Sequence, residues 1–62
     1  MVKVGDTIRI DYMDNEPQYT GKVGVVEKIT KDCYGEMRLE GTWGGCAIYP
    51  SIDSYTILNE GH

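Results

Sequence analysis

Glycine and proline interrupt this chain so often that long helices are excluded and short strands are favoured. Eight glycines and two prolines are spread over 62 residues, and both residue types end or weaken a helix. The apolar residues between them do not recur at the three- and four-residue spacing of a helix, but alternate with polar ones. The sequence therefore predicts an all-β fold.

The clearest alternation runs from Thr7 to Tyr12. Ile8, Ile10 and Tyr12 share one face of this expected strand, and the residues between them are polar. This parity predicts that Tyr12 packs toward the core. We expect four further strands, at residues 22–30, 36–40, 46–49 and 55–58. We also expect a long polar loop at residues 13–20 and a tight turn at residues 51–54.

The second expected strand, Lys22–Thr30, departs from strict alternation. Val23 and Val25 lie on one parity, which we assign to the core, and Val26 lies on the other. A one-residue slip reverses the faces of a strand, so the sequence predicts a β-bulge near residues 24–26. Bulges and glycines within strands bend sheets, and five short strands with one long loop predict a small antiparallel barrel.

The length and composition limit the range of functions. A chain of 62 residues is near the lower limit for one hydrophobic core, so we expect a single domain over residues 1–62. No apolar run approaches the roughly 20 residues of a membrane helix, and the chain opens without an apolar signal core. We therefore expect a cytoplasmic protein with no membrane partner, and a core too small for a substrate cavity.

Two segments resemble parts of known small barrels. Thr20–Ile29 is similar to the glycine-bracketed strand of KOW-type barrels, with the pattern Gly-x-x-Gly-x-Val-x-x-Ile. Ala47–Tyr55 resembles the strand, proline, tight turn and closing aromatic of SH3-like barrels. The resemblance implies a five-stranded antiparallel SH3-like barrel with a one-turn 3-10 helix before the last strand.

The whole chain is also similar to a small uncharacterised bacterial and phage family, domain of unknown function 4314. That family opens with Lys-x-Gly-Asp-x-[Ile/Val]-Arg, which Lys3–Arg9 matches, and closes with Pro-x-x-Asp-x-[Phe/Tyr], which Pro50–Tyr55 matches. The resemblance implies a fold and a phage or mobile-element setting. It implies no activity, because the family has none established.

The residues that carry catalysis or hold metals are too few to form a site. Cys33 and Cys46 form no Cys-x-x-Cys pair, and the single histidine is His62. Zinc needs four ligands as a rule, and no serine or cysteine has a histidine to activate it. We therefore expect two reduced thiols, no metal, no cofactor and no enzymatic activity.

The aromatic residues indicate a protein-binding surface. In peptide-binding SH3 domains, aromatic loop residues form a groove for extended segments, and acidic loop residues pair with a basic ligand. By this resemblance the candidate partner-binding residues are Tyr12, Asp14, Glu16, Tyr19, Trp43 and Tyr55. The chain departs from the pattern because its tryptophan follows the third expected strand, whereas those domains carry theirs before it. Packing of these rings into a core without phenylalanine is the alternative.

Nucleic-acid binding is a second possible function, since KOW-type barrels often bind nucleic acids. The candidate residues are Lys22, Lys28, Lys31 and Tyr34, which would supply backbone contacts and one stacking ring. Lys22 and Lys28 share parity, which predicts one outer face. Acidic residues alternate with these lysines, and a net charge of -4 disfavours a general grip on phosphates.

The acidic residues suggest a third function. Asp11, Asp14 and Glu16 could imitate phosphates and so inhibit a nucleic-acid-binding host protein, although the charge is modest for that purpose. Their spacing does not match a calcium-binding loop, and a solvated acidic loop is the simpler interpretation. The function we favour is a small non-enzymatic interaction module for a protein or peptide partner. The identity of that partner and the oligomeric state stay open.

Overall fold

Four antiparallel strands form the sheet in the computed structural model, which describes residues 2–59. They are β1 (Thr7–Tyr12), β2 (Val23–Lys31), β3 (Met37–Gly41) and β4 (Ser54–Ile57), and a short 3-10 helix, η1 (Pro17–Tyr19), lies between β1 and β2. The strand order is β3-β2-β1-β4. The all-β prediction is confirmed.

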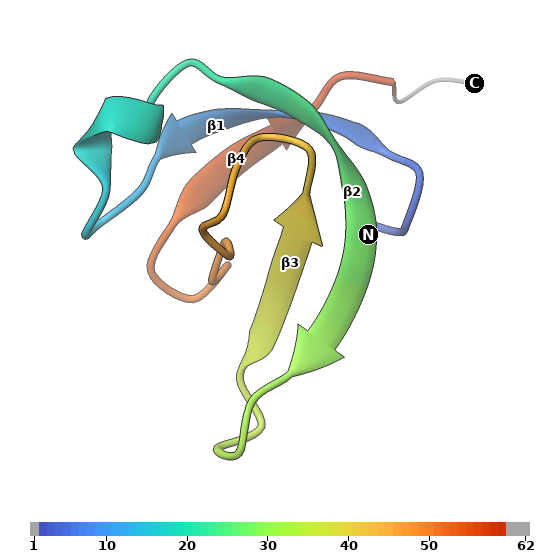
Figure 1. Ribbon diagram of the computed structural model, residues 1–62, viewed down its shortest axis with the longest axis vertical. Helices are drawn as coiled ribbons and strands as arrows, with labels where there is room; N and C mark the ends of the chain where they lie inside the picture. Colours follow the sequence, from blue (N-terminus) through green and yellow to red (C-terminus); the bar gives the residue numbers. More distant parts are fainter. Residues whose placement is uncertain (1, 60–62) are drawn as a thin grey trace.

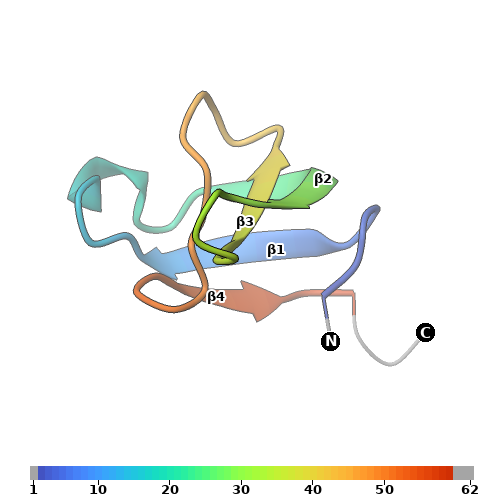
Figure 2. The ribbon, with the colours of Figure 1, turned by 90° about the horizontal axis from the view of Figure 1, so that it is seen from below.

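The long, bent strand β2 connects the two halves of the sheet. Its first half pairs with β1, where Val25 lies opposite Thr7, and its second half pairs with β3, where Ile29 lies opposite Leu39. In Figure 1, β2 curves from the direction of β1 into that of β3, and the β2–β3 hairpin extends away from the other strands. Figure 2 shows β1 between β2 and β4.

Aliphatic side chains from β1, β2 and β3 make half of the core, and residues outside the strands make the other half. Burial of this apolar surface is the main stabilising contribution in a domain of this size. The buried hydrophobic residues are Val2, Ile8, Ile10, Met13, Val26, Leu39, Trp43 and Ile48. Tyr19 and Tyr55 pack against them while half-buried. The core therefore uses tyrosine rings at its margin in place of phenylalanine.

A register shift at the end of β1 reverses the expected positions of two residues. The pairing of β1 with β4 shifts between Ile10 and Tyr12, which is a bulge. Tyr12 is consequently 48% exposed, whereas Met13 is only 2% exposed. The prediction that Tyr12 packs toward the core was wrong, because the extra residue turns Tyr12 outward and Met13 inward.

A second register shift lies in β2, slightly later than predicted. The pairing with β3 shifts between Val26 and Lys28 rather than at residues 24–26. Before the shift the core face belongs to Val26, which is 1% exposed, whereas Val23 and Val25 face outward at 55% and 38%. The assignment of Val23 and Val25 to the core was therefore wrong, and the bulge lets Ile29 return to the inner face.

The segment expected to form the fourth strand, 46–49, makes only a single bridge. Ile48 and Leu39 exchange two backbone hydrogen bonds, each 2.8 Å long. The described residues thus form four strands rather than five, and the sheet is not closed into a barrel. The 3-10 helix also differs from expectation, because η1 follows β1, while a simple turn closed by the Tyr49 carbonyl precedes β4.

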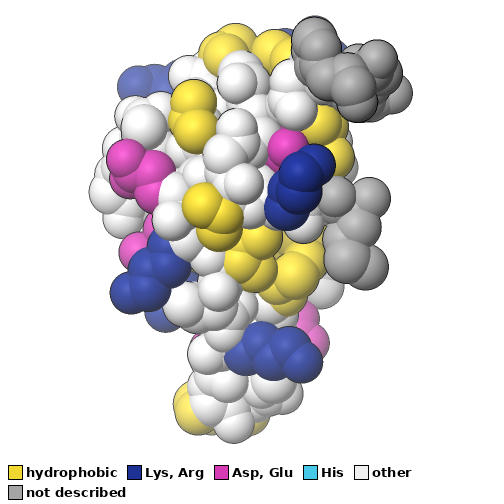
Figure 3. Space-filling view, turned by 90° about the vertical axis from the view of Figure 1, so that its right-hand side faces the viewer, with side chains coloured by type: hydrophobic (Ala, Val, Ile, Leu, Met, Phe, Trp, Pro, Cys, Tyr) yellow, Lys and Arg dark blue, Asp and Glu magenta, His cyan; other side chains and the backbone are white. Residues whose placement is uncertain are grey.

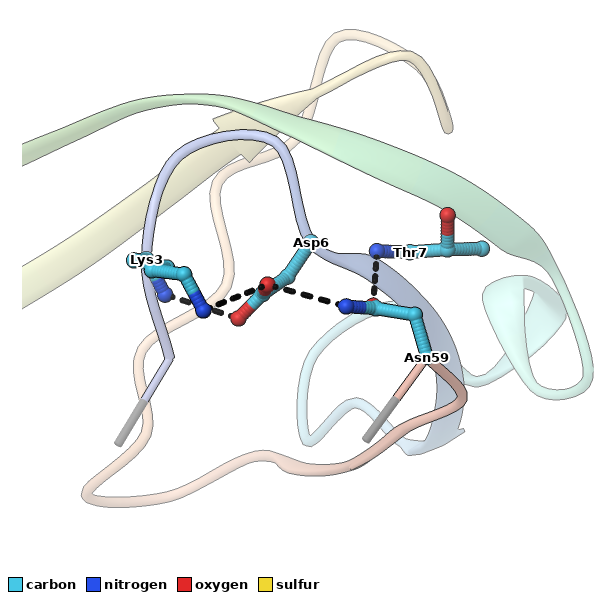
Figure 4. A network of polar contacts seen from close by, with 4 residues as sticks. All are labelled: Lys3, Asp6, Thr7 and Asn59. Carbon is cyan, nitrogen blue, oxygen red and sulfur yellow. Dashed lines mark hydrogen bonds and ion pairs between the residues drawn. The ribbon is translucent and has the colours of Figure 1, made fainter. Parts of the chain in front are cut away.

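The turn before β1 is organised by a buried carboxylate. Asp6 is 3% exposed and accepts hydrogen bonds from the Lys3 backbone N–H (2.9 Å) and the Asn59 amide (3.2 Å) (Figure 4). Asn59 in turn accepts the Thr7 N–H at 2.7 Å. These hydrogen bonds, the first of them foremost, lower the pKa of Asp6 from its usual value of 3.8. The Lys-x-Gly-Asp motif is therefore structural in this chain.

Candidate partner-binding site

A pocket lies between the loop after β1 and the segment before β4. It has a volume of about 210 Å³ and is partly open to solvent. Its lining residues are Met13, Asn15, Glu16, Cys46, Ala47, Tyr49, Ile52 and Asp53. We call residues 13–16 the loop wall and residues 46–53 the bridge wall. Two segments that are far apart in the sequence therefore form one recess.

Asp53 connects the two walls. The residue is 7% exposed, and each carboxylate oxygen accepts one backbone N–H at 2.9 Å, Oδ1 from Asp14 and Oδ2 from Tyr49. The Asp53 N–H donates to the Tyr49 carbonyl at 2.8 Å. A buried carboxylate needs such donors, because an unpaired charge away from water is costly.

The exposed rim of the pocket is apolar on one side and acidic on the other. Ile52 of the bridge wall is 53% exposed. On the loop wall, the Tyr12 hydroxyl donates to Asp14 Oδ1 at 3.1 Å, and Gln18 donates to Glu16 at 2.6 Å. The contact with Asp14 raises the pKa of Tyr12 above its usual value of 10.0, because a negative neighbour opposes its ionisation. The rim can therefore receive a segment that carries both apolar and basic side chains.

Trp43 and Tyr55, two of the predicted partner-binding residues, belong to the core or its margin. Trp43 is 3% exposed, and its indole N–H donates to the Cys46 carbonyl at 2.7 Å. The expectation that Trp43 offers a face to a partner does not fit this burial. Tyr55 is half-buried on β4 opposite Ile10, and burial raises its pKa, with the charge of Asp6 as a smaller cause.

Tyr19, a third predicted residue, lies beside the bridge wall without being one of the pocket's lining residues. Its ring covers Gly44, where a Cβ atom would lie 2.9 Å from the ring and its hydroxyl. A hydrogen bond with the Cys46 thiol raises the pKa of Tyr19. The ammonium of Lys22 lies 5.2 Å from the ring centre, at cation–π distance. Of the predicted residues, Glu16 thus lines the pocket, and Asp14 and Tyr12, in contact with each other, lie close to it in the chain without lining it.

Comparison with known proteins returns no match. The chain matches no protein-family model, no curated protein and no solved structure. The resemblances to SH3-like and KOW-type barrels and to the uncharacterised family therefore stay predictions. The site has to be interpreted from its own geometry.

The described residues supply no arrangement suited to metal binding. Within residues 2–59, no group of three or more histidine, cysteine, aspartate or glutamate residues could hold an ion. Cys33 is exposed and Cys46 is half-buried, and both are free cysteines. His62 lies outside the described residues. The same residues contain no helix of the length and apolarity that crossing a membrane requires.

The candidate nucleic-acid residues are spread along β2 and its hairpin. Lys22 lies next to Tyr19, Lys28 and Lys31 are exposed on β2, and Tyr34 is 87% exposed at the hairpin turn. The bulge between Val26 and Lys28 breaks the parity that suggested a common face for Lys22 and Lys28. Figure 3 shows the side along which β2 runs, where basic and acidic side chains surround hydrophobic ones. This is a mixed-charge face rather than a basic one.

The three residues of the predicted acidic patch do not act as one group. Asp11 pairs with the Arg9 guanidinium at 2.9 Å and accepts the Thr56 hydroxyl. The Thr56 contact, and then that of Arg9, lower the pKa of Asp11. Asp14 and Glu16 remain on the loop wall. Of these three residues, only Glu16 lines the pocket.

Sequence reasoning did not identify the residues that shape the pocket. Met13 belongs to the predicted polar loop, and its burial depends on the β1 bulge. Asp53 could have been identified from the sequence, because it is the aspartate of the Pro-x-x-Asp motif in Pro50–Tyr55. Ile52 had a weaker signal, since it is a single apolar residue in a polar turn.

Proposed function

We propose that this chain is a non-enzymatic interaction module that binds a short extended segment of a protein partner in the pocket between the loop wall and the bridge wall. The partner segment carries an aliphatic side chain for the pocket and an adjacent lysine or arginine for Asp14 and Glu16. On this proposal the fold is a reduced SH3-like barrel in a cytoplasmic protein, with Ile48 as the remnant of the strand expected at residues 46–49. Membership of the uncharacterised bacterial and phage family belongs to the same proposal.

The observation that carries the proposal is the partly open pocket of about 210 Å³ with the exposed Ile52 at its edge. Binding pockets are typically concave and mostly apolar, with a few polar groups that orient the ligand. Met13, Ala47 and Ile52 supply apolar lining and Glu16 supplies negative charge, while Asp14 lies between the lining residues Met13 and Asn15 in the chain. Charge complementarity therefore favours a basic partner segment.

Selection from a displayed library of random decapeptides would test this function. We expect the protein to enrich sequences that pair an aliphatic residue with a lysine or arginine. Synthetic copies of these peptides should shift the backbone NMR signals of residues 13–16 and 46–53. The absence of enrichment, or shifts confined to the β2–β3 hairpin, would contradict the proposal.

A pair of charge substitutions supplies the matched control. Ile52→Asp should weaken binding of a selected peptide by about tenfold or more, because it places a charge where an aliphatic side chain docks. Val4→Asp makes the same change at another exposed aliphatic residue, 57% exposed and outside the pocket lining. We expect Val4→Asp to leave the affinity unchanged. Equal losses in both variants would indicate a general charge effect.

A further inference from the structure

Asp6 and Asp53 are the two buried charged residues in the described part of the chain, and they have different surroundings. Asp6 is 3% exposed and Asp53 is 7% exposed. Asp6 stabilises the turn before β1 through Lys3 and Asn59. Asp53 is the one that lines the pocket. The two carboxylates thus offer a comparison between a structural role and a role at the site.

The two carboxylate oxygens of Asp53, itself a residue of the bridge wall, accept one backbone N–H from each wall. One oxygen holds the backbone of Asp14 on the loop wall, and the other holds the backbone of Tyr49 on the bridge wall, both at 2.9 Å. Among the hydrogen bonds of residues 2–59, the bond to Asp14 is the one that links residues 13–16 to residues 46–53. A single carboxylate therefore provides the hydrogen-bonded link between the two walls.

We infer that Asp53 is the positioning residue of the pocket: by holding Asp14 and Tyr49 at once, it sets the width of the recess and the place of the acidic rim. The consequence of this inference for partner binding rests on the proposed function. Loss of one oxygen frees one wall. Asp14 and the lining residue Glu16 close to it then no longer keep a fixed position relative to Ile52, and a partner segment loses its acidic and its apolar contact at the same time.

Asp53→Asn tests, without any ligand, whether Asp53 holds the two walls together. Asp6→Asn is its matched control. The asparagine amide replaces one accepting oxygen by a donor, so the Asp14 or the Tyr49 amide loses its partner. We expect hydrogen exchange at one or both of these amides to rise about tenfold. The Ile10 amide, which donates to the Lys22 carbonyl at 2.8 Å, reports general opening of the sheet and should change little. Asp6→Asn should leave the Asp14 and Tyr49 amides unchanged relative to Ile10.

Binding of a selected decapeptide then tests the positioning role. We expect Asp53→Asn to weaken it by about tenfold and Asp6→Asn to leave it unchanged. Faster exchange at Asp14 or Tyr49 with unchanged peptide affinity would overturn the positioning role. Hydrogen exchange that rises equally at the Ile10 amide, or that does not rise at the Asp14 and Tyr49 amides, would overturn the inference that Asp53 holds the two walls together. If wild-type protein selects no peptide, the proposed function fails, and the exchange rates still decide whether Asp53 holds the two walls.

Discussion

The single tryptophan reaches the core because two glycines leave room for it. A Cβ atom on Gly24 would lie 2.8 Å from the Thr42 hydroxyl and 3.1 Å from the Trp43 ring. A Cβ atom on Gly41 would overlap both the Val25 carbonyl and the same ring. Side chains at these positions would force the backbone or the indole to move, and packed interiors resist such shifts. These glycines are therefore required by packing rather than by a turn.

Gly41→Ala should lower the free energy of unfolding by about 1–3 kcal/mol, because the added methyl group has no space. Gly45→Ala is the matched control, since its Cβ would meet nothing within 4 Å. We expect that control to stay within about 0.5 kcal/mol of wild type. Urea unfolding followed by circular dichroism measures both. Equal stability of the two variants would show that the indole yields to the methyl group.

At the scale of single elements, the strand positions were largely predictable and the faces were not. The predicted range Thr7–Tyr12 matches β1, and the other three strands begin or end within one residue of expectation. Strand positions follow from local alternation, which the sequence carries. The bulges at Ile10–Tyr12 and Val26–Lys28 depend on cross-strand register, so the burial of Met13 could not be read from the sequence.

The pocket was hidden for the same reason. The segment 46–49 alternates like a strand, yet only Ile48 pairs with Leu39. The remainder of that segment is free to form one wall of the recess, and its partner wall depends on the β1 bulge. A site assembled from two irregular segments leaves little local pattern in the sequence. The acidic loop residues Asp14 and Glu16 could be predicted as candidates because their charge is evident from the sequence.

The turn of the β2–β3 hairpin depends on Asp32. Its Oδ1 accepts the backbone N–H groups of Tyr34 and Glu36, at 2.8 and 3.0 Å. Asp32→Ala should lower the free energy of unfolding by about 0.5–1 kcal/mol, because two turn donors lose their acceptor. Asp32→Asn keeps one side-chain oxygen and should lose less. Thermal unfolding of both variants is the measurement, and identical losses would argue that the turn forms without this side chain.

For the whole molecule, acid should destabilise the fold through two aspartates. The pKa values of Asp6 and Asp11 are lowered from 3.8 in the folded state. A carboxyl group with a lowered folded pKa contributes stability above its unfolded pKa, and this contribution disappears as the pH falls from about 4 through the folded value. Urea unfolding midpoints should therefore drop between about pH 5 and about pH 2. Asp6→Asn and Asp11→Asn should each make the urea unfolding midpoint depend less on pH. An unchanged pH dependence in both variants would contradict this expectation.

Alkaline conditions should also destabilise the fold, through three tyrosines. The pKa values of Tyr12, Tyr19 and Tyr55 are raised above 10.0 in the folded state. Because the folded state favours their neutral forms, the contribution is complete below pH 10 and disappears as the pH rises through the raised values. Tyrosinate absorbance should show a group that ionises later in native protein than in urea. A single shared transition in both conditions would contradict this expectation.

The network around Asp6 has a mechanical consequence. It places Lys3 and Asn59 together, and the first residue of β1 meets the residue after β4 through the hydrogen bond from the Leu58 N–H to the Thr7 carbonyl. A force that draws residues 3 and 59 apart therefore loads the β1–β4 ladder at one end only. Its hydrogen bonds break in succession, as in a zipper, rather than together in shear. The fold should yield to low pulling forces along this axis while resisting a pull between the hairpin turn and the loop wall.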